Sequence, residues 1–129
     1  MNGDVEPEPY NTAGCKIWRL AVTNERRNGV LVVAPAGRIG ALSAAAFAGA
    51  LAQAVTSGEH RLVVDFALVD YISGAGLRAL DHTATRLEAL QREIVVCALC
   101  EPVRLAFDLA GFLPRFAIEP SRDTAIARP

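Results

Sequence analysis

The chain has 129 residues, of which 52% are hydrophobic, so it is long enough to form one compact domain with a buried core. Thirteen basic and fourteen acidic residues give a formal net charge of -1, which argues against binding to nucleic acid or to an anionic membrane. Every long apolar stretch is interrupted before eighteen residues, so the sequence predicts no membrane-spanning helix.

The N-terminal residues 1–14, MNGDVEPEPYNTAG, are acidic and contain proline, which is typical of a flexible arm. The arm lacks the apolar centre of a signal peptide, so we expect a cytoplasmic protein. Two strand-like segments follow, at residues 15–23 and 30–34, and are joined by NERRNG. The Asn-Gly pair at positions 28 and 29 is a strong turn signal, which predicts a β-hairpin.

Helical spacing and strand-like runs alternate through the rest of the chain. A first helix is predicted after Ser43, its expected N-cap, with an inward stripe of Leu42, Phe47, Leu51 and Val55. RLVVDF at 61–66 predicts a buried, central strand. A second helix is predicted from Leu77 to near Arg92. Its expected inward residues are Leu77, Leu80, Ala84, Leu87 and Leu90, and its expected outward residues are Arg78, His82 and Thr85.

The last third of the chain repeats the alternation. EIVVCAL at 93–99 predicts a strand, and Pro102 and Gly111 bracket a short helix. A final strand is predicted at 115–118, and residues 121–129 are interpreted as a tail. The predicted order β-β-α-β-α-β-α-β indicates an α/β fold whose sheet begins with the hairpin, is mainly parallel in its later strands, and packs against about three to four helices.

Three cysteines, at positions 15, 97 and 100, are an odd number, which favours free thiols in a reducing compartment. Cys97 and Cys100 have the C-x-x-C spacing of a redox pair or of half a zinc site. The remaining candidate ligands, Cys15, His60 and His82, lie in separate predicted elements without paired spacing. We therefore interpret the cysteines as buried spectators and expect neither a metal nor a cofactor.

Two glycines, Gly74 and Gly76, precede the second predicted helix, although each costs about 1 kcal/mol relative to alanine inside a helix. A helix start without side chains lets another molecule approach the backbone closely, and a phosphate or a partner protein could bind there. Gly74, Gly76 and Ala79 match the dinucleotide motif G-x-G-x-x-A, with Glu101 as a candidate ribose ligand. Against this interpretation, ALVDYI separates the glycines from the preceding strand.

The segment from Leu62 to Gly111 resembles the STAS domain of bacterial anti-sigma factor antagonists. The resemblance is carried in order by VVDFALVDYISGAGLRAL, REIVVCAL and EPVRLAFDLAGF, and extends more loosely back through GVLVVAPAGRI to Cys15. The family's loop form Y-I-S-S-A-G-L is matched by Tyr71, Ile72, Ser73, Ala75, Gly76, Leu77 and Arg78. The resemblance implies a STAS domain over residues 15–120, between the arm and the tail.

The resemblance also implies a non-enzymatic partner-switching regulator of transcription. Such a domain docks on an ATP-binding anti-sigma kinase and frees the sigma factor, phosphorylation of a loop serine blocks docking, and a phosphatase restores it. A phosphate adds about -1.5 to -2 charges, which the helix start tolerates but which would repel an acidic or apolar partner surface. Whether the chain forms a homodimer is left open.

This sequence departs from the family at two positions of the expected docking region. The serine that is phosphorylated in family members falls on Gly74, and Gly40 stands where an acidic residue is common. Ser73 therefore has two interpretations, as the N-cap of the second helix or as a shifted phosphoacceptor. If neither residue is phosphorylated, binding is constitutive or is controlled elsewhere.

The expected partner-binding residues lie in the loop around 38–43, the 70–78 loop and the start of the second helix. They are Arg38, Ser43, Asp70, Tyr71, Ser73, Gly74, Ala75, Gly76, Arg78 and His82. Asp65 and Asp70 are interpreted as solvated loop acids, because no histidine or second carboxylate is placed to pair with them in catalysis. Two rival functions are kept: a STAS scaffold subunit of a stressosome-like or lipid-transport complex, and a nucleotide-binding protein that uses Gly74 and Gly76.

Overall fold

The computed structural model describes residues 20–129, so the predicted N-terminal arm and Cys15 lie outside the described residues. Six strands and four helices are formed by the described residues: β1 (Ala21–Arg27), β2 (Val30–Ile39), α1 (Ala44–Ser57), β3 (Arg61–Asp65), β4 (Leu68–Ile72), α2 (Gly74–Ala89), β5 (Glu93–Cys97), α3 (Glu101–Leu109), β6 (Ala117–Glu119) and α4 (Arg122–Ala127).

The hairpin predicted from Asn28 and Gly29 is confirmed. β1 and β2 are antiparallel, and Arg27 pairs with Val30, so only two residues form the turn. Both turn residues have left-handed backbone angles, with φ of 56° at Asn28 and 78° at Gly29, as a type I′ hairpin turn requires. The segment NERR, which we expected in the connection, instead belongs to β1.

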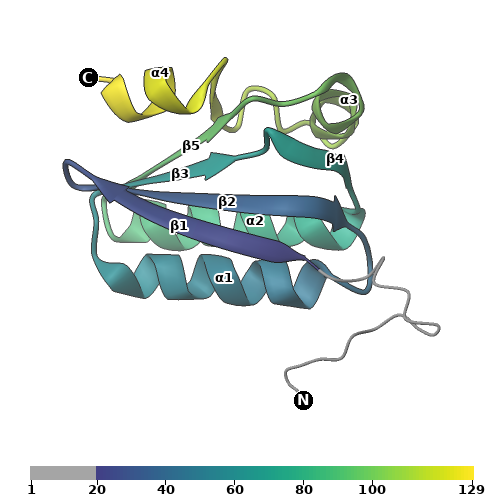
Figure 1. Ribbon diagram of the computed structural model, residues 1–129, viewed down its shortest axis with the longest axis horizontal. Coiled ribbons are helices and arrows are strands. Elements are labelled where there is room, and N and C mark those ends of the chain that lie inside the picture. Colours follow the sequence, from purple (N-terminus) through teal and green to yellow (C-terminus); the bar gives the residue numbers. More distant parts are fainter. Residues whose placement is uncertain (1–19) are drawn as a thin grey trace.

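The sheet has the strand order β1-β2-β3-β5-β6, and β4 pairs separately with β2 (Figure 1). After the hairpin the strand pairs are parallel, and β3 lies in the middle, as predicted. β2 is long enough to pair twice. Its first half, Val30–Val33, pairs with β3, and its second half, Ala36–Ile39, pairs with β4. The end of β4 therefore lies beside the end of β2.

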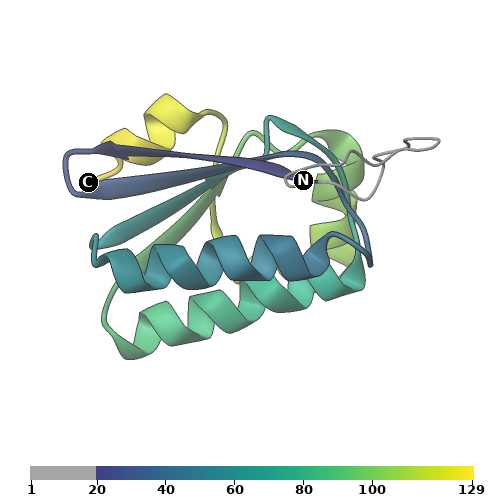
Figure 2. The same ribbon diagram turned by 60° about the horizontal axis from the view of Figure 1, so that its bottom comes forward.

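Two layers of side chains cover the sheet. Alternation along β2 points Leu31 and Val33 toward the larger core on the α1 and α2 face, and Val30 and Val32 toward the face covered by α4. Figures 1 and 2 show α1 and α2 side by side beneath the sheet and α4 on the opposite face. α3 packs against β4 at one end of the sheet.

The helical stripes are confirmed except at their ends. In α1 the predicted inward residues Phe47, Leu51 and Val55 are buried, but Leu42 is 79% exposed because it precedes the helix. α2 begins at Gly74, three residues earlier than predicted. Four of its predicted inward residues are buried and its predicted outward residues are exposed, but the fifth inward residue, Leu90, is the exposed C-cap residue.

Two elements are missing from the sequence prediction. The segment LVDYI, which we interpreted as a loop, forms β4. The predicted tail at 121–129 contains α4, which starts with a capping box between Ser121 and Thr124.

The interpretation of Asp65 as a solvated loop acid is wrong. Asp65 is 5% exposed and pairs with Arg122 of α4 at 2.8 Å, so it is a buried ion-pair partner and not a solvated acid.

The two described cysteines do not form a metal site. Cys97 is fully buried and Cys100 is partly buried, and both are free thiols. Within residues 20–129, no group of three or more histidine, cysteine or acidic side chains is arranged to hold a metal ion. In the same range, no helix has the length and apolar character needed to cross a membrane.

Candidate functional site

The junction between β4 and α2 is a single residue, Ser73. Its backbone N–H donates to the carbonyl of Ile39 at the end of β2, with an N to O distance of 2.7 Å. Its side-chain Oγ accepts from the N–H of Gly76 at 3.2 Å, so Ser73 is the N-cap of α2, as one of the two interpretations predicted. Ser73 thus fixes the helix start against the sheet.

The two glycines of the helix start have different environments. Gly76 is buried, and a Cβ atom there would lie 2.8 Å from both Ile39 Cγ2 and Ile72 Cγ1, which is closer than side chains tolerate. Gly74 is exposed, and a Cβ atom there would meet only Arg78 Nη1, at 3.4 Å. Close packing on the sheet therefore explains Gly76, and Gly74 is the glycine that faces solvent.

This packing bears on the nucleotide interpretation. Our objection that the glycines do not follow a strand is wrong, because β4 leads into α2 through Ser73 alone. A dinucleotide fingerprint nevertheless needs glycine backbone that the pyrophosphate can approach. The space beside Gly76 is occupied by Ile39 and Ile72, so this glycine is not available to a phosphate.

Arg38 and Tyr71 form a cross-strand pair beside the helix start. They are register partners in β2 and β4, next to an irregularity between Gly37 and Arg38. The guanidinium carbon of Arg38 lies 3.9 Å from the centre of the Tyr71 ring, which is a cation–π contact. Both side chains are exposed, so this pair presents a positive charge on an aromatic support.

Ser43 shapes the loop that leads into α1. It directly precedes the helix, as predicted, but its hydroxyl makes no capping hydrogen bond. Instead, Oγ donates to the carbonyl of Arg38 at 2.7 Å and accepts from the N–H of Gly40 at 2.9 Å. Because Ser43 is only 2% exposed, it orders the loop around Arg38 from inside and does not present its own side chain to solvent.

The predicted site residues therefore differ in their exposure to solvent. Ser43 and Gly76 are buried, Ser73 and Ala75 are partly buried, and the exposed residues are Arg38, Asp70, Tyr71, Gly74, Arg78 and His82. Sequence reasoning missed the exposed side chain of Leu42, which the expected helical stripe had placed inward. We call Arg38, Leu42, Tyr71, Gly74 and Arg78 the α2-entrance surface, because the Arg38 to Tyr71 contact and the Ser73 to Ile39 hydrogen bond join their segments.

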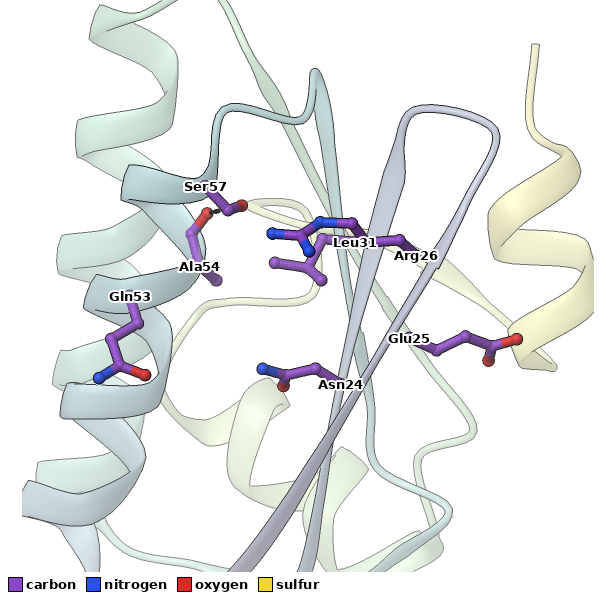
Figure 3. A pocket seen from close by; sticks show the side chains of 7 residues that line it. All are labelled: Asn24, Glu25, Arg26, Leu31, Gln53, Ala54 and Ser57. Atoms are coloured by element: carbon purple, nitrogen blue, oxygen red, sulfur yellow. Dashed lines mark hydrogen bonds between the residues drawn. The ribbon is translucent and has the colours of Figure 1, made fainter.

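A hollow lies away from this surface, between the hairpin and α1. It has a volume of about 350 Å³, and its lining residues are shown in Figure 3. Two of its polar side chains are already engaged, since Arg26 pairs with Glu59 at 2.7 Å and Ser57 donates to the same carboxylate. Glu25 turns to the other side of the hairpin, where it pairs with Arg122. We therefore place the candidate site at the α2 entrance.

Comparisons with known proteins agree with this fold. The family model of the STAS domain matches residues 21–125, and the chain therefore belongs to the STAS domain family. It is 36% identical over 108 residues to BtrV of Bordetella bronchiseptica, a candidate anti-sigma factor antagonist, and the match covers 84% of this chain and 93% of BtrV.

Solved structures show the same architecture. An anti-sigma factor antagonist from Mycobacterium paratuberculosis matches with a TM-score of 0.79 and 27% identity, over 84% of this chain and 92% of the other. The unphosphorylated form of the antagonist SpoIIAA matches with a TM-score of 0.72 over 84% of this chain and 95% of the other, but at 17% identity this likeness concerns the fold alone. The protein is thus an anti-sigma factor antagonist-like STAS protein, as the resemblance in the sequence implied.

Proposed function

We propose that this chain is a partner-switching regulator that binds an ATP-binding anti-sigma kinase through the α2-entrance surface. The observation that carries the proposal is that this surface is exposed in a STAS domain similar to anti-sigma factor antagonists, while the buried residues around it hold it in place. Ser43 and Gly76 support the surface from within, and His82 and Asp70 border it. No reacting group is required for such a function.

Binding through this surface is proposed to be constitutive. The position expected to carry the phosphorylated serine is occupied by Gly74, which has no hydroxyl. The neighbouring hydroxyl, that of Ser73, already accepts the N–H of Gly76 as the helix cap. A kinase could still use Ser73, because the start of a helix tolerates a phosphate. Phosphorylation of Ser73, reversed by a phosphatase, is therefore the alternative mode of control.

A tryptophan substitution at Gly74, with a matched control at Gly49, tests the docking surface. Gly74→Trp fills the exposed helix entrance, whereas Gly49→Trp makes the same exchange on the exposed side of α1, where a Cβ atom has no neighbour within 4 Å. The probe is the purified anti-sigma kinase encoded nearest to this chain's gene, titrated by calorimetry. We expect Gly74→Trp to weaken binding at least about ten-fold and Gly49→Trp to leave it unchanged. Wild-type affinity in a folded Gly74→Trp protein would refute the proposal.

A scaffold role is the second candidate, and one observation favours it. Leu105 and Leu109 lie one turn apart on α3 and are 57% and 81% exposed, which provides an apolar strip outside the α2-entrance surface. A scaffold subunit would use such a strip to enter a large particle, whereas a free switch would be a monomer or a homodimer. Size-exclusion chromatography with light scattering separates these outcomes, and a particle of many subunits would favour the scaffold.

A further inference from the structure

Six of the eleven arginines in residues 20–129 are paired with acids, and both arginines of the α2-entrance surface are among the five that are not, with Arg86, Arg92 and Arg104. Ion pairs hold the following arginines: Arg26, Arg27, Arg61, Arg115, Arg122 and Arg128. Arg38 and Arg78 make no ion pair or hydrogen bond through their guanidinium groups to any residue in 20–129, and both are exposed. Their positive charges are therefore not neutralised by the described fold.

Each of these arginines lies beside a glycine. A Cβ atom on Gly40 would lie 3.8 Å from Arg38 Nε, and a Cβ atom on Gly74 would lie 3.4 Å from Arg78 Nη1. An acidic side chain at position 40, or a phosphorylated one at position 74, would reach these guanidinium groups within the same chain. With glycine at both positions, neither guanidinium group has an acidic partner among residues 20–129 that would compete with another molecule.

We propose that Arg38 and Arg78 receive acidic side chains from the partner, so that the partner's docking face is acidic around an apolar contact with Leu42. This inference rests on the proposed function and names the chemistry of the partner. The Tyr71 ring restrains the guanidinium group of Arg38, whose central carbon lies 3.9 Å from the ring centre, in an exposed position where it can pair with a carboxylate. Exposed arginines on a rigid support are typical of surfaces that pair with carboxylates.

The charged groups around the α2-entrance surface are consistent with an acidic partner. The one acid of the 70–78 segment is Asp70, which is exposed on β4, and His82 lies one turn beyond Arg78 on the outward side of α2. Asp81, the next acid along α2, is already paired with Arg115 at 3.1 Å. The docking region thus carries two unpaired guanidinium groups against one free carboxylate among the described residues, and it favours an anionic face.

Paired substitutions separate charge from shape. Gly40→Glu and Gly74→Glu each place a carboxylate beside an arginine, and Gly40→Gln and Gly74→Gln add a side chain of the same size without the charge. Neither glycine has a left-handed φ and neither Cβ position is crowded by backbone, so all four variants are expected to fold. The probe is again the purified anti-sigma kinase encoded nearest to this chain's gene, titrated at about 50 and about 300 mM salt.

We expect each glutamate variant to bind at least about five-fold more weakly than its glutamine counterpart, and salt to weaken the wild type more than the glutamate variants. Equal affinities of glutamate and glutamine variants, both below the wild type, would overturn the acidic partner but retain the docking surface. Tighter binding by the glutamate variants would overturn it by indicating a basic partner. Wild-type affinity in all four variants would overturn both this inference and the docking surface of the proposed function.

Discussion

At the scale of single residues, Gly76 decides how closely α2 approaches the sheet. A glycine in a helix costs about 1 kcal/mol relative to alanine. Glycine is required at position 76, because a Cβ atom there would lie 2.8 Å from side-chain carbon atoms of both Ile39 and Ile72. The close approach brings the ends of β2 and β4 against the start of the helix, and it therefore fixes the position of Ser73 and Arg78.

Alanine substitutions at the two glycines are predicted to act in opposite directions. Gly76→Ala should lower the free energy of unfolding by about 1 to 3 kcal/mol, because overpacking outweighs the gain in helix propensity. Gly74→Ala should be neutral or stabilising by up to about 1 kcal/mol, because its Cβ atom makes an ordinary contact. Urea unfolding of both variants measures the difference. A stabilised Gly76→Ala protein would contradict the packing argument.

Cys97 gives the fold a dependence on alkaline pH. Burial, followed by the nearby charge of Asp65, raises the thiol pKa from an ordinary value of 9.0 to about 12. The unfolded chain therefore loses this proton at a lower pH than the folded chain. The contribution of Cys97 to stability is complete below about pH 9 and is lost as the pH rises from there toward 12.

The variant Cys97→Ala is predicted to flatten this dependence. Its free energy of unfolding should fall less steeply than that of the wild type between about pH 8 and about pH 10. Urea unfolding across this pH range measures the two slopes. Identical slopes for the wild type and Cys97→Ala would show that Cys97 ionises equally in both states.

At the scale of elements, α4 depends on contacts from distant parts of the chain. It has six residues, which is too short for a helix to be stable alone. Arg61 of β3 donates to carbonyls at its C-terminal end, including that of Arg128 at 2.6 Å. Arg122 pairs with Asp65 and with Glu25, each at 2.8 Å. These arginines hold α4 over the second apolar face of the sheet.

Loss of the partly buried pair between Arg122 and Asp65 should destabilise the fold more than loss of an exposed pair. Arg122→Ala leaves the carboxylate of Asp65, whose side chain is 7% exposed, without its guanidinium partner, so we expect about 1 to 3 kcal/mol of destabilisation. Arg27→Ala removes exposed contacts of 3.5 and 3.8 Å and should cost less than about 0.5 kcal/mol. Thermal and urea unfolding compare the two. Similar effects for both variants would contradict the special role of Arg122.

The elements that the sequence predicted are those with a strong local signal. The Asn28-Gly29 turn, the proline and glycine that bracket α3, and the buried stripes of α1 and α2 apart from Leu42 and Leu90 were identified correctly. β4 was missed because it follows β3 after only two residues and is defined by pairing with the distant second half of β2. α4 was missed because its stability comes from Arg61 and Arg122, although its capping box was visible in the sequence.

The same distinction applies to the candidate site. The outward positions of Arg78 and His82 follow from helix periodicity and were predicted, and the Ser73 cap was one of the two interpretations of that residue. The burial of Gly76 and the internal hydrogen bonds of Ser43 depend on how separate segments meet, which the sequence does not display. The pairing of Arg38 with Tyr71 required β4 to be recognised as a strand.

At the scale of the whole molecule, the parallel topology gathers the candidate site at one end. α1 and α2 each follow a strand of the same parallel set, so their starts lie together, as Figure 2 shows. The loop at 40–43, which carries Leu42, therefore lies beside the start of α2, while the helix α4 lies on the face of the sheet opposite to α1 and α2. A partner could dock on the helix starts without disturbing either apolar layer of the core.

Incubation with the kinase and ATP tests the central claim most directly. The chain is mixed with the purified anti-sigma kinase encoded nearest to its gene and with ATP, and its intact mass and its binding are followed together. We predict an unchanged mass and a complex that persists, because Gly74 offers no hydroxyl. A gain of about 80 Da, one phosphoryl group, that releases the complex and disappears in Ser73→Ala would contradict constitutive docking.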